Sequence, residues 1–222
     1  MTSIGKLWTV SYQPTGRRIR AIVAFADLSV EIPDNFKFPG DNRSPEFTAK
    51  FLSGKIPAFE DNDGFCLFET TAIAEYVASL APKSGLIGTS PKELAVIHQW
   101  VSFADAEIAR FTGLIAQMLN GIVPYHKDIH AKLTENQIRS FDTLEKHLSN
   151  RTFLVSDKIT LADITMVSVL SSALYFTLDA TLRKKYPSIV QFYERVIDHP
   201  KIKDLNWTRE YVEKAKEYVP KE

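Results

Sequence analysis

The chain has 222 residues, 45% of them hydrophobic, and its 27 Lys and Arg residues balance its 27 Asp and Glu residues. This length allows one domain or two small ones, and the zero net charge gives no support to direct binding of nucleic acid or of an anionic membrane. A single cysteine, Cys66, excludes an internal disulfide framework and a multi-cysteine zinc site, which fits a reducing, cytoplasmic environment.

The first part of the chain alternates strand-forming and helix-periodic segments. Strands are expected over 6–12, 30–36, 56–59 and 65–68, and helices over 17–27, over 45–52 and from Glu69–Thr70 onward. Pro33 interrupts the second of these strands. The order β-α-β-α-β-β-α is the thioredoxin-like arrangement. We therefore expect an α/β thioredoxin-like N-terminal domain over residues 1–81.

The second part of the chain shows mainly helical periodicity. Residues 82–91 concentrate Pro, Gly and Ser, which is typical of a linker, and residues 92–222 then form an all-helical C-terminal domain. Thr160 and Asp163 have the spacing of a capping box at the start of the most apolar helix. The expected helices cover 92–120, 128–149, 161–177, 187–198 and 206–217.

The most informative stretch surrounds Ile56-Pro57 and Glu69-Thr70. Pro57 opens a strand, and the Ile56–Pro57 bond is a candidate for the cis form. Such a bend is expected to leave the Ile56 amide and carbonyl free for a ligand. The Thr70 hydroxyl and the first helical amides converge where the helix dipole favours an anion. The pair predicts a clamp for an extended peptide that carries a carboxylate.

This arrangement resembles the glutathione-binding half of the cytosolic glutathione transferases. Within that superfamily it is most similar to the transferase-like domain of the elongation factor 1 gamma subunit, which writes this region as Gly-Lys-Val-Pro-Ala-Phe-Glu and Gly-Phe-Cys-Val-Phe-Glu-Ser. The likeness continues over 99–105, 151–155 and 160–165, and it spans roughly residues 5–205. It implies the glutathione transferase fold, with glutathione as a co-substrate.

The resemblance also implies roles for the residues that bind glutathione. Glu69 faces the ammonium and Thr70 the carboxylate of the γ-glutamyl end; the alternative, which the matching strand and proline disfavour, is that the pair only complements the dipole and caps the helix. Ile56, beside Pro57, pairs through its backbone with the cysteinyl portion. Lys55 faces the glycyl carboxylate, or is a solvated surface lysine.

Asp105 and five large side chains of the helical domain each have two interpretations. In some relatives the residue at the position of Asp105 reaches the ligand amine of the neighbouring subunit, and the alternative is an ordinary polar helix position. The electrophile pocket is expected between the first loop and the helices near 100–120 and 207–220. Five side chains either line it or fill the core: Trp100, Phe103, Phe111, Met118 and Trp207.

Catalysis would require a stabilised glutathione thiolate, because a free thiol with a pKa near 8.5 is mostly protonated at neutral pH. Relatives place a hydroxyl or thiol at the end of the first strand or at the start of the following helix. Tyr12 aligns best with the family tyrosine, and Ser11 and Thr15 are the other hydroxyls within reach. Arg17 either adds a positive charge near the thiolate or lies on the helix surface.

Two functions remain open at this point. One is a homodimeric enzyme that conjugates glutathione to an electrophilic small molecule. The other is a scaffold of the elongation factor 1 gamma type that holds partner subunits of the translation machinery. The chain ends at Glu222, where gamma subunits continue, so we expect a stand-alone transferase unless it is a fragment. The five histidines form no metal-ligand spacing, and no segment offers about 18 uncharged apolar residues for a membrane span.

Overall fold

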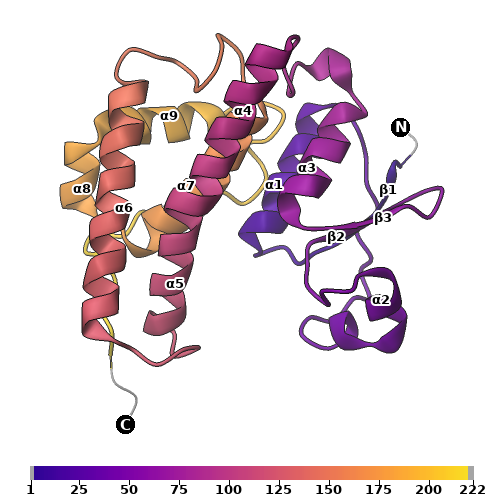
Figure 1. Ribbon diagram of the computed structural model, residues 1–222, viewed down its shortest axis with the longest axis horizontal. Coiled ribbons are helices and arrows are strands. Elements are labelled where there is room, and N and C mark those ends of the chain that lie inside the picture. Colours follow the sequence, from indigo (N-terminus) through magenta and orange to yellow (C-terminus); the bar gives the residue numbers. More distant parts are fainter. Residues whose placement is uncertain (1–2, 220–222) are drawn as a thin grey trace.

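The computed structural model describes residues 3–219, so the expected chain end at Pro220–Glu222 lies outside the described residues. Figure 1 shows a small sheet with its helices on one side of the molecule and a larger helical part on the other. The elements are β1 (Gly5–Trp8), α1 (Pro14–Phe25), η1 (Asp41–Arg43), α2 (Pro45–Lys50), β2 (Ala58–Asp61), β3 (Cys66–Phe68), α3 (Thr70–Ser79), η2 (Pro82–Ser84), α4 (Pro91–Phe103), η3 (Ala104–Ala109), α5 (Arg110–Leu119), α6 (Lys127–Leu148), α7 (Leu161–Phe176), α8 (Ala180–Lys185) and α9 (Pro187–Ile197).

The sheet has the strand order β1-β2-β3 with both neighbouring pairs antiparallel. Leu7 pairs with Phe59, and both side chains are fully buried against α1 and α3, which lie side by side on one face. Helix α1 approaches β1 so closely that a Cβ atom on Gly16 would collide with the Thr9 hydroxyl. Glycine is therefore required at Gly16 for steric reasons, since its backbone conformation is ordinary.

The strand expected over 30–36 is wrong, because only a single isolated bridge forms there. Glu31 makes an isolated parallel bridge with Lys6, and its amide donates to the Gly5 carbonyl at 2.9 Å. The pairing stops within two residues because Pro33 has no amide hydrogen to continue the ladder.

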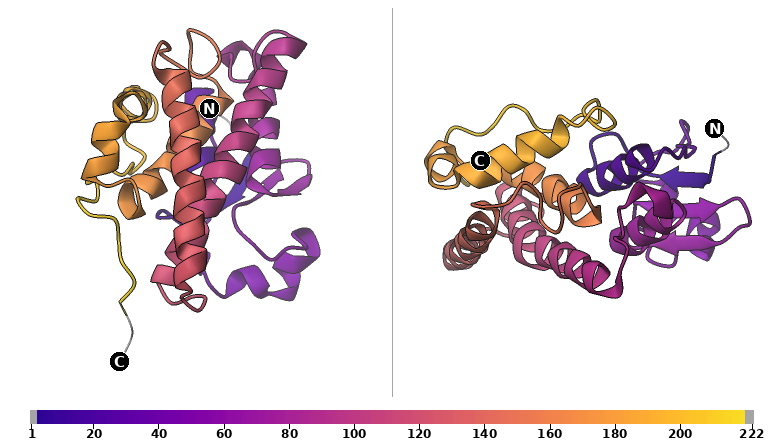
Figure 2. Two further views of the ribbon diagram at one scale, coloured as in Figure 1. Left: turned by 60° about the vertical axis from the view of Figure 1, so that its left-hand side comes forward. Right: turned by 90° about the horizontal axis from the view of Figure 1, so that it is seen from above.

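Helix α7 forms the centre of the helical part. It contacts α1, α4, α5 and α9, and the right-hand view of Figure 2 shows it between α4 and α9. The expected capping box is confirmed: the Asp163 carboxylate accepts hydrogen bonds from the Thr160 amide at 2.8 Å and from the Leu154 amide at 2.8 Å. Asp163 is fully buried, and this burial raises the pKa of its carboxyl group.

The expected helix over 206–217 is wrong, because this segment is an extended strap. The Val212 amide donates to the Leu174 carbonyl and the Lys216 amide to the Phe176 carbonyl, both at 2.9 Å. These carbonyls belong to the last turn of α7 and have no acceptor role within the helix. The strap therefore satisfies the end of α7, and its own amides are not available for helical bonds.

The other expected helices are present with small shifts in their bounds. The helix over 92–120 runs through α4, the π-helical η3 and α5 without a break, and the short α8, which the sequence did not predict, begins after the capping residue Asp179. One continuous apolar core includes Leu7 and Ile73 of the first part and Ile164 and Phe192 of the second. Among the described helices, none combines the length and hydropathy needed to cross a bilayer.

Candidate functional site

The bend before β2 adopts the expected backbone form. The Ile56–Pro57 bond is cis, and both residues are buried. The Ile56 carbonyl is not free, because it accepts a 2.6 Å hydrogen bond from Gln13 Nε2. This part of the expectation is therefore wrong. The Ile56 amide, by contrast, has no partner within residues 3–219.

Gln13 connects this bend to the loop that follows β1. Its Oε1 atom accepts a 2.9 Å hydrogen bond from Thr9 Oγ1 while its Nε2 atom donates to Ile56, so both ends of the amide are engaged. No sequence pattern had indicated this role for Gln13. Gln13 is the N-cap residue of α1, and its side chain makes no cap hydrogen bond. Glutamine is not among the residues preferred at an N-cap, and this is the signal in the sequence that its side chain has another role.

Glu69 and Thr70 lie where β3 turns into α3. Glu69 has φ 75° and ψ 120°, a positive φ that costs a non-glycine residue roughly 1–3 kcal/mol. The Glu69 side chain is exposed and makes no cap hydrogen bond, and Thr70 is the first helical residue. The amides of the first turn of α3 have no helical partner, and such a helix N-terminus favours an anion.

Asp105 is engaged within its own chain. Its carboxylate accepts hydrogen bonds from Arg18 Nη2 at 2.6 Å, from Arg18 Nη1 at 3.0 Å and from Thr71 Oγ1 at 2.9 Å. The Arg18 side chain is 2% exposed and that of Asp105 35%. The bidentate pair joins α1 to η3, and the Thr71 hydrogen bond joins α3 to η3. Neither Arg18 nor Thr71 was singled out from the sequence.

The structure separates the expected catalytic residues. Ser11 and Tyr12 lie in the exposed turn after β1, with Tyr12 67% exposed, and Arg20 Nη2 donates to the Ser11 carbonyl at 3.1 Å. Thr15 lies in the first turn of α1 and lines a cavity. Arg17 points into the core instead of onto the helix surface.

The surroundings of Arg17 leave it without a carboxylate partner. Its Nη1 atom donates to Ser171 Oγ at 2.9 Å, and its guanidinium lies 5.5 Å from the centre of the Trp207 ring. Burial lowers the pKa of the Arg17 guanidinium, which remains a cation at neutral pH because its ordinary value is so high. Within residues 3–219 no acid pairs with it, and it does not line the cavity at Thr15.

The cavity beside Thr15 has a volume of about 240 Å³ and lies between α1, α5 and α7. Ala109, Gly113 and Ala116 form one wall, and Phe176 closes part of another. A Cβ atom added to Gly113 would meet nothing within 4 Å. The cavity is therefore small and mostly apolar, and there is space beside Gly113 for a side chain.

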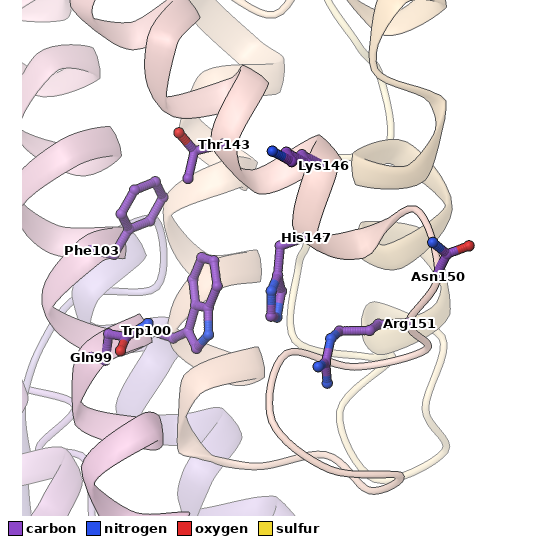
Figure 3. Close-up of a pocket in the computed structure, with 8 residues that line it drawn as sticks. All are labelled: Gln99, Trp100, Phe103, Thr143, Lys146, His147, Asn150 and Arg151. Carbon is purple, nitrogen blue, oxygen red and sulfur yellow. The ribbon is translucent and has the colours of Figure 1, made fainter.

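The aromatic and methionine residues expected at the electrophile pocket lie in different parts of the structure. Trp100 and Phe103 line a separate cleft between α4 and α6 (Figure 3), whereas Phe111 and Met118 belong to a small apolar cluster with Ile115 and Leu133. None of the five aromatic or methionine candidates lines the cavity at Thr15.

Two further groups near the bend have clear properties. Lys55 is exposed just before Ile56. Cys66 is partly buried in β3, and burial raises the pKa of its thiol, so it is protonated at neutral pH and is a poor nucleophile. Within the described part of the chain, no three His, Cys, Asp or Glu side chains gather to hold a metal ion.

Comparisons with known proteins place this geometry in a family. Residues 3–79 match the model of the glutathione S-transferase N-terminal domain, and residues 111–200 match that of the C-terminal domain. The glutathione S-transferase-like protein LUC7 of Fusarium is 38% identical over 92% of this chain and 94% of its own length. The chain belongs to the glutathione S-transferase family. The resemblance expected from the sequence, and with it the fold class, is confirmed.

Other relatives of this transferase-family chain carry a different name. Elongation factor 1-gamma of Rattus norvegicus is 35% identical over 90% of the chain, but the match covers 46% of that protein's length. The crystal structure of the GST-like domain of elongation factor 1-gamma from Saccharomyces cerevisiae has a TM-score of 0.84 at 24% identity, over 99% of this chain and 100% of that one.

A further solved relative, the glutathione transferase URE2P6 from Phanerochaete chrysosporium, was crystallised with oxidized glutathione. It has a TM-score of 0.82 at 22% identity, over 91% of this chain and 94% of that one. At these identities both structural likenesses establish the fold alone.

Proposed function

We propose that this family member is a glutathione transferase that conjugates reduced glutathione to electrophilic small molecules through a stabilised thiolate. The observation that carries the proposal is the convergence of three features. Gln13 joins the loop before Thr15 to Ile56, whose amide has no partner within residues 3–219. Thr71, in the first turn of α3, donates to Asp105, which lines the cavity at Thr15.

In this proposal glutathione lies extended across the bend. The Thr70 hydroxyl and the first amides of α3 bind the γ-glutamyl carboxylate, and Glu69 binds the adjacent ammonium. The Ile56 amide donates to the cysteinyl carbonyl beside Pro57, and Lys55 meets the glycyl carboxylate. Each ionic group of the tripeptide then faces a group of opposite charge or polarity.

In this proposal a hydroxyl donor stabilises the thiolate, and backbone amides or Arg17 are the alternative. Thr15 is the candidate that lines the cavity, and its hydroxyl makes no hydrogen bond within residues 3–219. Tyr12 and Ser11 remain candidates because their exposed turn lies directly before it. The sulfur forms a bond to the electrophilic carbon while an electron pair passes to a leaving group, to the oxygen of an enone or to the nitrogen of an isothiocyanate. The thiol proton goes to solvent, and solvent protonates the adduct where no group leaves.

The second candidate function is a scaffold of the elongation factor 1 gamma type, which would bind subunits of the translation machinery with little or no turnover. The similarity to elongation factor 1-gamma favours it, and so does the 67% exposure of Tyr12, the hydroxyl that aligns best with the family tyrosine. In either function we propose a homodimer that packs the first part of one subunit against the helical part of the other.

Calorimetry with glutathione tests the binding site. Thr70→Val removes a hydrogen bond to a charged group and should weaken affinity about ten- to a hundredfold. Thr181→Val, an exposed threonine of α8, is the matched control and should leave affinity unchanged. Equal affinity of the wild type and Thr70→Val would remove the proposed site.

Turnover with an aryl halide, an enone and an isothiocyanate tests catalysis. Replacing the essential donor, in Thr15→Val, Tyr12→Phe or Ser11→Ala, should lower the rate roughly 100-fold and raise the kinetic pKa of bound glutathione. If the wild type binds glutathione and turns over none of the three electrophiles, the scaffold function takes the place of the enzyme. Light scattering at micromolar concentration tests the dimer, and the mass of one chain would contradict it.

A further inference from the structure

One side chain joins the loop after β1 to the bend before β2. Gln13 Nε2 donates to the Ile56 carbonyl at 2.6 Å, and Gln13 Oε1 accepts from Thr9 Oγ1 at 2.9 Å. Within residues 3–219, no other hydrogen bond joins residues 9–15 to residues 54–57, because the ladder between β1 and β2 ends before them. Gln13 therefore supplies the hydrogen-bonded link between the two segments.

The partners of Gln13 determine which way its side-chain amide faces. A carbonyl oxygen can only accept, so the NH2 group must face Ile56 and the amide oxygen must face Thr9, whose hydroxyl can donate. The backbone is fixed as well, since the Gln13 amide donates to the Val10 carbonyl at 3.1 Å and the Gln13 carbonyl accepts from the Arg17 amide at 3.0 Å. Gln13 is thus held by both its backbone and its side chain.

Gly16 leaves the room that this arrangement needs. A Cβ atom on Gly16 would collide with Thr9 Oγ1 and would lie 3.2 Å from Gln13 Oε1, so a side chain there would displace the Thr9 hydroxyl. Thr9 is buried, which limits the access of water to its bond with Gln13. The contacts run in order from Gly16 through Thr9 and Gln13 to Ile56.

Glutathione would place two atoms of one residue against the two segments that Gln13 joins. In the proposed binding mode the Ile56 amide donates to the cysteinyl carbonyl, and a hydroxyl at Thr15 or in the turn before it donates to the cysteinyl sulfur. The separation of these two ligand atoms is set by covalent geometry, so the two donors must match it. A misplacement of about 1 Å can lower a rate about 100-fold. Gln13 lies two residues before Thr15 and bonds to Ile56 itself.

We propose that Gln13 is a positioning residue for the glutathione thiolate, because it holds the loop that carries Thr15 at the distance from Ile56 that the cysteinyl residue requires. The inference rests on the proposed glutathione site and does not depend on turnover of an electrophile. Gln13 acts through the segments that its amide connects. Thr9 supports the same role, because its hydroxyl orients that amide.

The test is the thiol pKa of protein-bound glutathione, followed by the ultraviolet absorbance of the thiolate. Calorimetry with S-methylglutathione, which has no ionisable thiol, accompanies it. Gln13→Met keeps the length of the side chain without its hydrogen bonds. It should raise the thiol pKa by about 1 and change the affinity for S-methylglutathione less than about threefold. Gln191→Met, at an exposed position of α9, is the matched control and should change neither.

Variants of Thr9 separate positioning from direct contact with the sulfur. Thr9→Val removes the hydroxyl that orients the Gln13 amide and should also raise the thiol pKa. Gln13→Met/Thr9→Val should raise it no further than Gln13→Met does, because the two residues act through one connection. Thr9→Ser keeps a hydroxyl and should retain the wild-type pKa. Circular dichroism should show the helix content of the wild type in every variant.

Four results would overturn the proposal. The first is a thiol pKa in Gln13→Met equal to that of the wild type. The second is a loss of affinity for S-methylglutathione as large as the loss for glutathione, which would mean that the whole site is distorted. The third is tighter binding of glutathione by Gln13→Met, which would mean that Gln13 blocks the Ile56 carbonyl. The fourth is additive pKa changes in Gln13→Met and Thr9→Val. These results leave the proposed function standing, whereas a wild type that binds no glutathione would overturn the proposed function and this inference together.

Discussion

Removal of the Asp105 carboxylate should destabilise the fold through the arginine that it leaves behind. Arg18 is 2% exposed, and Asp105 is the acid that pairs with it, through hydrogen bonds of 2.6 and 3.0 Å. Breaking a buried ion pair from one side costs roughly 3–5 kcal/mol. The Asp105 side chain is 35% exposed, so water replaces part of the lost interaction, and we expect Asp105→Ala to lower the free energy of unfolding by about 2–3 kcal/mol.

Two further variants separate the buried charge from other effects. Arg18→Met/Asp105→Ala removes both charges and should recover at least half of the loss, because no cation then remains buried without a partner. Glu107→Ala is the matched control in the same π-helical segment: its pair with Arg139, whose side chain is 66% exposed, should contribute less than about 1 kcal/mol. Urea unfolding followed by circular dichroism measures all three, with an unchanged m value as the condition for comparing midpoints.

An unpaired buried charge is not the cause if Asp105→Ala lowers the free energy of unfolding no more than Glu107→Ala does. The same conclusion follows if Arg18→Met/Asp105→Ala is no more stable than Asp105→Ala. Glutathione affinity of the same variants tests the other role of Asp105. If Asp105 reached the ligand amine of a neighbouring subunit, Asp105→Ala would lower the affinity and leave stability near that of the wild type. The intrachain pair predicts the opposite order of effects.

Three other perturbations have directions that the structure fixes. Asp163→Asn places an amide group against donors such as the Thr160 amide and should lower the free energy of unfolding by about 2–4 kcal/mol, measured by urea unfolding. Burial lowers the pKa of His147 in the folded state, so below about pH 6.5 the unfolded chain binds more protons than the folded chain. The free energy of unfolding should therefore decrease as the pH is lowered below that value. His147→Gln, which keeps a donor for the Leu154 carbonyl, should flatten the melting temperature against pH in that window. Gly113→Leu places a side chain in the cavity at Thr15, where the hexyl chain of S-hexylglutathione would otherwise bind. Calorimetry should show an affinity for S-hexylglutathione that is about tenfold lower and an unchanged affinity for glutathione.

Local signals predicted the elements that depend on a few consecutive residues. Pro57 identified the bend before β2, and the cis form expected there is present. The spacing of Thr160 and Asp163 identified the start of α7, because a capping box needs only residues three positions apart. The family, and with it the fold class, followed from these blocks. The domain boundary at 82–91 and the roles of the site residues stay predictions.

The errors arose where an element depends on a distant one. Residues 206–217 have helical periodicity but bond to the last carbonyls of α7, so the end of another helix decided their form. The segment 30–36 lies beside β1 for one bridge and then stops at Pro33. Periodicity reports which residues are apolar, and it does not report which backbone groups elsewhere need partners.

The sequence by itself determined the family, the order of most helices and strands, and the residues around Ile56 and Glu69 that form the candidate glutathione site. Each of these depends on short-range chemistry: a proline, a helix start, or a cap. Only the tertiary structure decided what surrounds them. Gln13 reaches Ile56 across 43 positions and Arg18 reaches Asp105 across 87, and no local pattern encodes such separations. The cavity at Thr15 and the cleft at Trp100 form where helices far apart in the chain meet with small or charged side chains. They depend on how the helices pack, and no single segment of the sequence specifies them.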